Sequence, residues 1–167
     1  MTNSKTDYSK QVLFLADEAE TTALAQRLAE AVNASKAYEN GVMVYLNGDL
    51  GAGKSFFSRA FIQSYLPGQK VKSPTYTIVE TYNCYNLSIH HLDLYRLCDP
   101  EELEYLAIRD LLSASYVALV EWPEKGHGIL PVADIEINLS HREQGRQIEL
   151  HANSVKGDSV LAKLSDF

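Results

Sequence analysis

A glycine-rich segment at residues 48–55 has the pattern of a loop that binds nucleotide phosphates. It reads GDLGAGKS, and Gly48, Gly53, Lys54 and Ser55 fill the fixed positions of GxxxxGK[ST]. Glycine lets successive backbone N–H groups turn toward a phosphate, the lysine adds charge at the β- and γ-phosphates, and the hydroxyl ligates Mg²⁺. The pattern therefore predicts a site for ATP and Mg²⁺. The residues expected at the nucleotide are Gly48, Asp49, Leu50, Gly51, Ala52, Gly53, Lys54, Ser55 and Phe56.

Two acidic residues are candidates for the metal and water side of such a site. P-loop ATPases need a carboxylate near Mg²⁺ and a group that orients the attacking water. Glu121 follows the apolar run YVALV, at the C-terminal end of an expected strand, where open α/β sheets bind ligands. Asp93 lies in HLDLY and shares one strand face with His91. Spacing alone fits a functional role and an ordinary strand-end charge equally well for both acids, and it favours a hydrogen-bonded strand residue over a metal ligand for His91.

Thr75 and Trp122 are further candidates, each with an alternative interpretation. Thr75 follows Ser73-Pro74 in a loop that crosses toward the next strand, where a hydroxyl could sense the γ-phosphate or touch Mg²⁺. Spacing alone favours a turn and strand start. Trp122, beside Glu121, could stack on the base, although packing at the sheet edge is the commoner fate of a single tryptophan.

The elements around the glycine-rich segment are those that a phosphate loop requires. Residues 42–46 (VMVYL) form a short apolar run that predicts a strand buried on both faces. Residues 55–66 can form a helix that ends before Pro67-Gly68. Upstream, residues 11–16 predict a strand, and residues 18–33 an amphipathic helix that begins with a capping box at Asp17 and Glu20.

The rest of the chain continues this alternation. Apolar and β-branched patterns predict strands over 75–82, 88–97 and 116–120, a helix over roughly 101–113, a hairpin of 135–139 with 146–151, and a terminal helix over 158–166. We therefore expect an α/β fold with a mixed, mostly parallel sheet, helices on both faces and antiparallel additions. The 167 residues suit one domain, 10–167, after a flexible tail, 1–9.

Composition restricts the classes of partner. The formal net charge is −7, which disfavours autonomous binding to nucleic acid, so any contact with RNA would run through another protein. No apolar run approaches the roughly 20 residues of a membrane span, and the N-terminus lacks the apolar stretch of a signal peptide. We expect a cytoplasmic protein that does not contact a membrane.

The sequence also bears on which kind of nucleotide protein this is. The DxxG and NKxD segments of a GTPase are absent, and no cluster of arginines follows the phosphate loop at the spacing of a kinase lid. A small-molecule kinase remains an alternative, because any phosphate loop can serve one. A nucleotide-gated adaptor with negligible turnover is the other.

Five motifs together resemble one protein family, the TsaE (YjeE) family of bacterial ATPases. They are GDLGAGKS at 48–55, SPTY at 73–76, HLDLYRL at 91–97, PEELE at 100–104 and LVEWPEKG at 119–126. The resemblance covers roughly residues 12–140 and implies a P-loop NTPase fold. It also implies ATP hydrolysis that supports the formation of N6-threonylcarbamoyladenosine beside the anticodon of tRNAs reading codons that start with A. The implied partners are the TsaD and TsaB proteins, and tRNA would be met only through that complex.

The resemblance also implies roles for individual residues. Lys54 would contact the phosphates, Ser55 and Asp93 would ligate Mg²⁺, and Thr75 would act as a switch-like residue. Glu121 resembles the acid that supports hydrolysis, and Trp122 the aromatic side chain near the nucleotide. The sequence departs from the common GAGKTT of the family at Phe56, which removes a hydroxyl that often reaches the α-phosphate. The backbone N–H of Phe56 remains as a donor.

Overall fold

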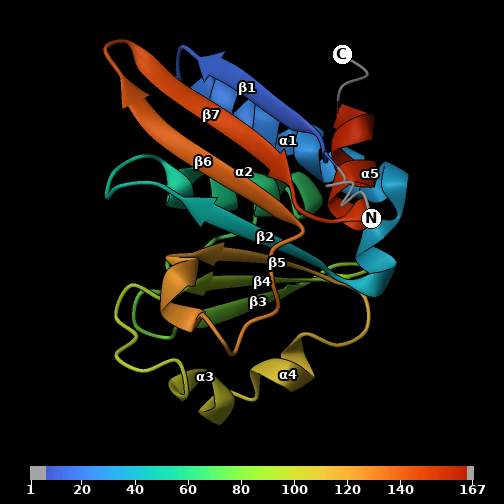
Figure 1. Ribbon diagram of the computed structural model, residues 1–167, viewed down its shortest axis with the longest axis vertical. Helices are drawn as coiled ribbons and strands as arrows, with labels where there is room; N and C mark the ends of the chain where they lie inside the picture. The colour runs from blue at the N-terminus through green and yellow to red at the C-terminus, as the bar shows by residue number, and fades with distance from the viewer. Residues whose placement is uncertain (1–6, 165–167) are drawn as a thin grey trace, which may run out of the picture.

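The fold is built around one β-sheet (Figure 1). The structure is a computed structural model and describes residues 7–164. Over that range the sheet has seven strands in the order β1-β7-β6-β2-β5-β4-β3. The elements are β1 (Lys10–Leu15), α1 (Glu18–Ser35), η1 (Ala37–Asn40), β2 (Val42–Asn47), α2 (Lys54–Tyr65), β3 (Val79–Asn83), β4 (Ser88–Asp93), α3 (Glu102–Tyr105), α4 (Ile108–Leu111), β5 (Tyr116–Glu121), η2 (Pro123–Gly126), β6 (Ile135–Arg142), β7 (Gly145–Ala152) and α5 (Val155–Leu164).

The sheet has a parallel centre and antiparallel margins. β2 pairs in parallel with β5 and β6, and β5 pairs in parallel with β4. β3 runs antiparallel to β4, while β7 runs antiparallel to both β6 and β1. The expected mixed sheet with antiparallel additions is confirmed, and the parallel strands end on one edge, where ligands of open α/β sheets bind.

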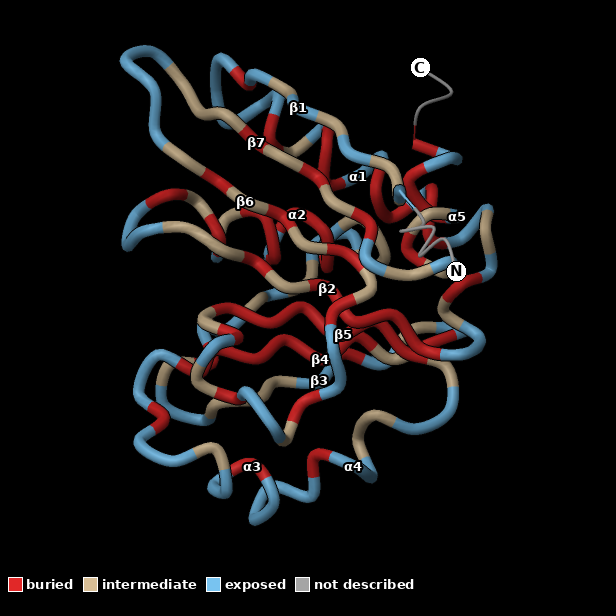
Figure 2. Tube along the Cα trace, in the orientation of Figure 1, coloured by how far each residue is buried: buried red, intermediate tan, exposed pale blue. Residues whose placement is uncertain are grey.

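Helices cover both faces of the sheet, as predicted (Figures 1 and 2). Leu28 of α1, Phe61 of α2 and Val160 of α5 belong to one apolar cluster with the side chains of one sheet face. Leu103 of α3 and Ile108 of α4 belong to a second cluster on the opposite face. Because β2 and β5 contribute to both clusters, their sequences are apolar runs rather than alternating patterns. β4 also contributes to both clusters, but its sequence, SIHHLD, includes the buried polar residues His90 and His91.

The first residues of α1 and α2 show what makes each helix begin where it does. At α1, the Asp17 carboxylate accepts from the backbone N–H of Glu20 at 2.9 Å, and the Glu20 carboxylate accepts from the N–H of Ala16 at 2.5 Å. The Asp17 carboxylate thus satisfies a donor that the helix start leaves free, whereas the Glu20 carboxylate accepts from Ala16, one residue before the N-cap, instead of from Asp17 as in a standard capping box. α2 begins directly at Lys54, so the phosphate loop leads into its positive end.

The predictions of strands at 75–82 and 88–97 are wrong at the start of the first and at the end of the second. Residues 75–78 turn instead of extending, because Ile78 has φ +69° and its N–H donates to the Pro74 carbonyl at 2.8 Å. β4 stops at Asp93, whose carboxylate accepts from the N–H of Tyr95 at 3.0 Å. Both turns lie at the edge of the sheet where the parallel strands end, and they change which side chains face that edge.

The helix predicted over 101–113 is two short helices, α3 and α4. Ala107 has φ +52°, a left-handed conformation that interrupts the helix, and its N–H donates to the Glu104 carbonyl at 3.1 Å. The break allows Leu103 and Ile108 to be buried together under the sheet. Leu106, which a continuous helix would bury, is 36% exposed.

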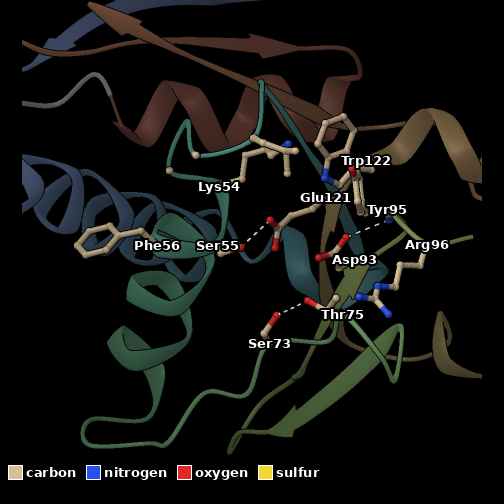
Figure 3. Close-up of a pocket in the computed structure, with 13 residues that line it drawn as sticks. Lys54, Ser55, Phe56, Ser73, Thr75, Asp93, Tyr95, Arg96, Glu121 and Trp122 are labelled. Carbon is tan, nitrogen blue, oxygen red and sulfur yellow. Dashed lines mark hydrogen bonds between the residues drawn. The ribbon is translucent and has the colours of Figure 1, made fainter.

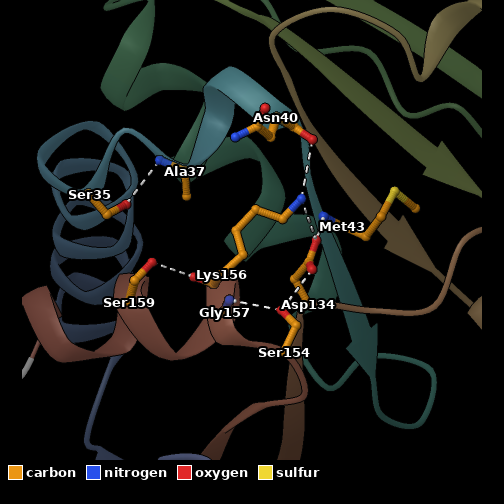
Figure 4. Close-up of polar contacts among 9 residues, drawn as sticks. All are labelled: Ser35, Ala37, Asn40, Met43, Asp134, Ser154, Lys156, Gly157 and Ser159. Atoms are coloured by element: carbon orange, nitrogen blue, oxygen red, sulfur yellow. Dashed lines mark hydrogen bonds and ion pairs between the residues drawn. The ribbon is translucent and has the colours of Figure 1, made fainter.

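The last helix begins at Val155, earlier than the predicted residue 158. Ser154 determines this start, since its hydroxyl accepts from the N–H of Gly157 at 3.0 Å (Figure 4). The same hydroxyl donates to Asp134 at 2.8 Å, and Asp134 also accepts from the N–H of Met43 at 2.8 Å. This network joins α5 to the first residues of β2 and β6. The predicted end of the helix, at residue 166, lies outside the described residues.

The start of the chain is partly described. Of the predicted tail 1–9, residues 1–6 lie outside the described range. Ser9 is held in place: its backbone N–H donates to Asp158 at 2.9 Å, and its carbonyl accepts from the N–H of Ala152 at 3.0 Å. No helix in residues 7–164 combines the length and apolar character needed to cross a membrane.

Candidate nucleotide-binding site

The glycine-rich segment forms the turn between β2 and α2, at the end of the parallel strands. Gly53 has φ +108°, and a Cβ atom built on it would lie 2.0 Å from Nη1 of Arg146. A Cβ on Gly48 would lie 2.6 Å from the carbonyl oxygen of Leu139. The turn is closed by a hydrogen bond of 3.0 Å from the N–H of Ala52 to the Asp49 carbonyl. Only glycine fits at positions 48 and 53 without displacing neighbours.

Lys54 directs its ammonium group back across the loop. Nζ donates to the Gly48 carbonyl at 2.5 Å and lies 3.6 Å from the centroid of the Trp122 ring. The residue is only 5% exposed, and burial lowers the pKa of Lys54 against the opposing effect of Glu121. Within residues 7–164 no carboxylate lies within 4.0 Å of this ammonium. A buried cation held by one carbonyl and one ring is suited to receive an anion.

A pocket of about 410 Å³ opens beside this loop (Figure 3). It gathers side chains from the phosphate loop, α2, the turn before β3 and the ends of β4 and β5. Its lining residues are Leu50, Gly51, Gly53, Lys54, Ser55, Phe56, Ser73, Thr75, Asp93, Tyr95, Arg96, Glu121 and Trp122. Ten of the candidates chosen from the sequence therefore lie around one space: Leu50, Gly51, Gly53, Lys54, Ser55, Phe56, Thr75, Asp93, Glu121 and Trp122.

The remaining candidates of the loop lie next to the pocket. Asp49 and Gly48 line a smaller adjoining cavity together with Lys54 and Trp122. Ala52 is 1% exposed and packs into the core, so its side chain faces away from the pocket. The Phe56 ring lies 5.4 Å from the guanidinium carbon of Arg59, one turn further along α2.

Glu121 is the most tightly held of the two acids. Its Oε1 accepts from the Ser55 hydroxyl at 2.9 Å, and its Oε2 lies 2.6 Å from Nε2 of His91. Glu121 and His91 are each 2% exposed. The Ser55 hydroxyl therefore donates to Glu121, the acid expected to orient the attacking water. Since Ser55 is a predicted Mg²⁺ ligand, Glu121 lies beside the predicted metal position.

Asp93 lies opposite Glu121 in the parallel register of β4 and β5. It is 9% exposed, and burial is the largest cause that raises the pKa of Asp93 above its ordinary value. The negative charge of Glu121 acts in the same direction, while Lys54 and the Tyr95 N–H act against it. Because two neighbouring carboxylates repel each other when both are ionised, a cation bound near Asp93 and Glu121 would stabilise their charged forms.

Thr75 and Trp122 complete two walls of the pocket. The hydroxyl of Thr75 lies 2.7 Å from that of Ser73, in the turn before β3 (Figure 3). The Trp122 ring packs between Lys54 and the Tyr95 ring, whose centroid lies 5.1 Å away at 51°. The backbone of Trp122 has φ +57°, which turns its side chain from the strand direction into the pocket.

The preference for His91 as a hydrogen-bonded strand residue is confirmed, since its Nε2 contacts Glu121 at 2.6 Å, although the sequence did not indicate that partner. One neighbour of the phosphate loop was not predicted. Arg146, at the start of β7, carried no signal, because its place against Gly53 depends on the β6–β7 hairpin returning to the loop. Nη1 of Arg146 is buried without a hydrogen-bond partner among the described residues.

The contact between Gly53 and Arg146 supports a prediction. Gly53→Ala is expected to lower the free energy of unfolding by about 1–2 kcal/mol or more, because it adds strain at positive φ and a clash with the guanidinium. Gly51→Ala is the matched control: its φ is +79°, but a Cβ there meets nothing within 4 Å. Thermal unfolding without ligand should show the larger loss for Gly53→Ala, with partial recovery in Gly53→Ala/Arg146→Ala. Equal losses at the two glycines would contradict the clash.

Comparisons with known proteins identify the family of this chain. A family model described as "Threonylcarbamoyl adenosine biosynthesis protein TsaE" matches residues 15–148. A Haemophilus influenzae protein named "tRNA threonylcarbamoyladenosine biosynthesis protein TsaE" is 49% identical over 128 residues, covering 77% of this chain and 81% of that protein. A Bacillus subtilis protein of the same name is 37% identical over 126 residues, covering 75% of this chain and 78% of its own length.

A solved structure has the same fold. The crystal structure of YdiB from Bacillus subtilis superimposes with a TM-score of 0.71 at 25% sequence identity, covering 95% of each chain. The fold is therefore the P-loop fold expected from the sequence. Because a family model matches residues 15–148 and a relative that is 49% identical covers 77% of the chain, this chain belongs to the TsaE family of threonylcarbamoyl adenosine biosynthesis proteins.

Proposed function

We propose that this chain is the Mg²⁺-dependent ATPase of a bacterial system that forms N6-threonylcarbamoyladenosine in tRNA. The observation that carries the proposal is the convergence of Lys54, Ser55, Asp93 and Glu121 on one pocket at the end of the parallel strands. The family name supports the tRNA modification, and the pocket supports the nucleotide chemistry.

The residues present fit ATP with Mg²⁺. The buried ammonium of Lys54 has no carboxylate partner in the described part of the chain, and the loop brings N–H groups and the α2 N-terminus to the same place. No group of three or more Asp, Glu, His or Cys side chains within residues 7–164 could hold a metal alone. A magnesium ion here would therefore take oxygens from phosphates and water as well as from Ser55 and a carboxylate. When bound, it would neutralise charge on the phosphates.

We assign the roles of the side chains on this basis. Lys54 binds the phosphates, Ser55 and Asp93 face the metal, and Glu121 orients the attacking water. Thr75 senses the γ-phosphate from the turn before β3. Trp122 contacts the nucleotide, as do the loop residues from Gly48 to Phe56. The Ser55–Glu121 hydrogen bond also brings Glu121 next to a predicted metal ligand, so substitutions at both acids are needed to separate their roles.

We further propose that the chain acts in the cytoplasm with TsaD and TsaB and meets tRNA only through them. Its net charge of −7 supports an indirect contact with RNA and complementary contact with basic protein surfaces. A site that binds ATP without full stabilisation of the transition state hydrolyses it slowly. Partners that complete or remodel the site would then accelerate turnover.

Steady-state phosphate release tests this proposal. We expect slow hydrolysis by the isolated chain with Mg·ATP and a stimulation of at least tenfold when purified TsaD and TsaB are added, with a smaller stimulation at moderate than at low salt. Rapid turnover that partners leave unchanged would contradict the partner dependence.

The same assay separates the two alternative functions. Transfer of the γ-phosphate to a small acceptor instead of water would identify a kinase. Tight ATP binding with no phosphate release, with or without partners, would identify a nucleotide-gated adaptor.

A further inference from the structure

The pocket contains two cationic side chains among its described lining residues, Lys54 and Arg96. Lys54 belongs to the phosphate loop and lies on the side of Gly48. Arg96 enters from the turn after β4 and points toward Thr75, on the other side of Asp93 and Glu121 (Figure 3). The two positive charges thus flank the two acids from different elements.

The turn after β4 presents Arg96 to the pocket in a defined way. The carboxylate of Asp93 accepts from the N–H of Tyr95, and the N–H of Leu97 donates to the Leu94 carbonyl at 3.0 Å. Leu94 and Leu97 are buried beneath the turn. Tyr95 and Arg96, the two residues between them, are therefore left on the pocket side.

The guanidinium of Arg96 has no acidic partner in the described part of the chain. Its carbon atom lies 4.3 Å from the centroid of the Tyr76 ring, and no carboxylate of residues 7–164 lies within 4.0 Å of its nitrogen atoms. The Tyr76 ring is 80% exposed, and a cation–π contact at such a site is weak compared with a bidentate phosphate pair. By contrast, Arg109 pairs with Glu104 at 3.3 Å, away from the pocket.

We propose that Arg96 is a catalytic residue of the ATPase, supplied by the same chain, and that its guanidinium stabilises the charge that develops on the γ-phosphoryl group. This inference rests on the proposed ATPase function. Water forms a bond to the γ-phosphorus while the bond to the bridging oxygen of ADP breaks. The electron pair of that bond stays on ADP, and the proton released by the water passes to solvent or phosphate. Arg96 transfers no proton and contributes by charge and hydrogen bonding.

The position of Arg96 indicates that it stabilises the transition state of hydrolysis more than it strengthens the binding of ATP. Lys54 and the loop N–H groups already bind the phosphates in the ground state. Arg96 reaches the pocket from a different element, and in the free protein its guanidinium contacts only the Tyr76 ring among the interactions described. We therefore expect Arg96 to interact most strongly with the negative charge that develops on the γ-phosphoryl group in the transition state. Arginine also offers paired donors that match equatorial phosphoryl oxygens, which lysine does not.

The test compares Arg96→Ala, Arg96→Lys and the control Arg109→Ala, each measured with TsaD and TsaB present. Single-turnover phosphate release should fall about 10³-fold or more in Arg96→Ala and recover only in part in Arg96→Lys. The Kd of a non-hydrolysable ATP analogue should change less than about tenfold, while the affinity for ADP with aluminium fluoride, which mimics the transferring phosphoryl group, should fall by at least about a hundredfold. Arg109→Ala should match wild type in all three measurements.

The outcomes distinguish this inference from the function on which it rests. Unchanged hydrolysis and unchanged aluminium fluoride affinity in Arg96→Ala, with an active wild type, would overturn the role of Arg96 alone. Equal losses for the ATP analogue and the aluminium fluoride complex would also overturn it, since they would make Arg96 a ground-state binding residue. If neither the wild type nor Arg109→Ala hydrolysed ATP, the proposed ATPase function would be refuted, and the role of Arg96 with it.

Discussion

Lys54→Ala is expected to weaken the binding of Mg·ATP by about 2 kcal/mol or more, at least a thirtyfold rise in Kd. Lys54 is the one cation of the phosphate loop itself, it is almost fully buried, and it has no carboxylate partner among residues 7–164. An ammonium in such surroundings has already lost most of its hydration, so its bond to a phosphate is worth more than a surface ion pair. Titration calorimetry of the isolated chain measures the loss directly.

Two controls make this result specific to the site. Lys70→Ala removes a lysine that is exposed beyond the end of α2 and should bind as wild type does. Thermal unfolding of Lys54→Ala without ligand should show little loss of stability. Removing a buried charge that has no carboxylate partner among residues 7–164 relieves a desolvation cost, which offsets the lost hydrogen bond to the Gly48 carbonyl. Wild-type affinity in a folded Lys54→Ala variant would refute the assignment of the phosphate loop.

The second large effect concerns the two acids. Glu121→Gln is expected to slow single-turnover hydrolysis at least about a hundredfold and to leave the Kd for Mg·ATP within a few-fold of wild type, if the acid acts on water. Asp93→Asn should instead weaken binding in the presence of Mg²⁺ and change it little without Mg²⁺. The amide variants are preferred to alanine, because His91 and Ser55 would lose their partner on a truncated Glu121.

The hydrogen bond from Ser55 makes the opposite result informative. If Glu121→Gln loses Mg²⁺-dependent affinity and Asp93→Asn loses hydrolysis, the two acids exchange the roles given to them. If both variants lose only binding, neither acid acts on water. The comparison is made by calorimetry with and without Mg²⁺ and by phosphate release in a single turnover, with Asp110→Asn, an exposed acid of α4, as the control.

The parts of the site that could be predicted from sequence are those that are local in the chain. The glycine spacing of 48–55 defines a loop whose function depends on its own backbone, so it was readable without the fold. Glu121 followed an apolar run, and the parallel register of β4 and β5 then placed it opposite Asp93. In both cases a short stretch of sequence carries the physical constraint.

The parts that could not be predicted depend on contacts between distant segments. Arg146 reaches Gly53 only because β7 pairs back along β6, and no pattern near residue 146 indicates that neighbour. The turns at 75–78 and after Asp93 replaced predicted strand, because β-branched and aromatic residues favour strands locally while hydrogen bonds at Pro74 and Tyr95 bend the chain. The break at Ala107 is similar: helical spacing persists through it, and only burial under the sheet selects two helices.

The pairing of β1 with β7 has a consequence for how this protein is made. Lys10 pairs with His151, so β1, which leaves the ribosome before the other six strands described in residues 7–164, pairs with β7, which leaves it after them. Until then, Leu13 and Leu15 have no strand beside them, and the exposed edge of a nascent chain is a template for wrong pairing. Contacts between residues far apart in sequence also slow folding, because the long loop between the two strands must be closed, at a cost in chain entropy, before they can pair. Synthesis past residue 152 is therefore the step at which the sheet can close, and chains released earlier should be the ones that aggregate or are degraded.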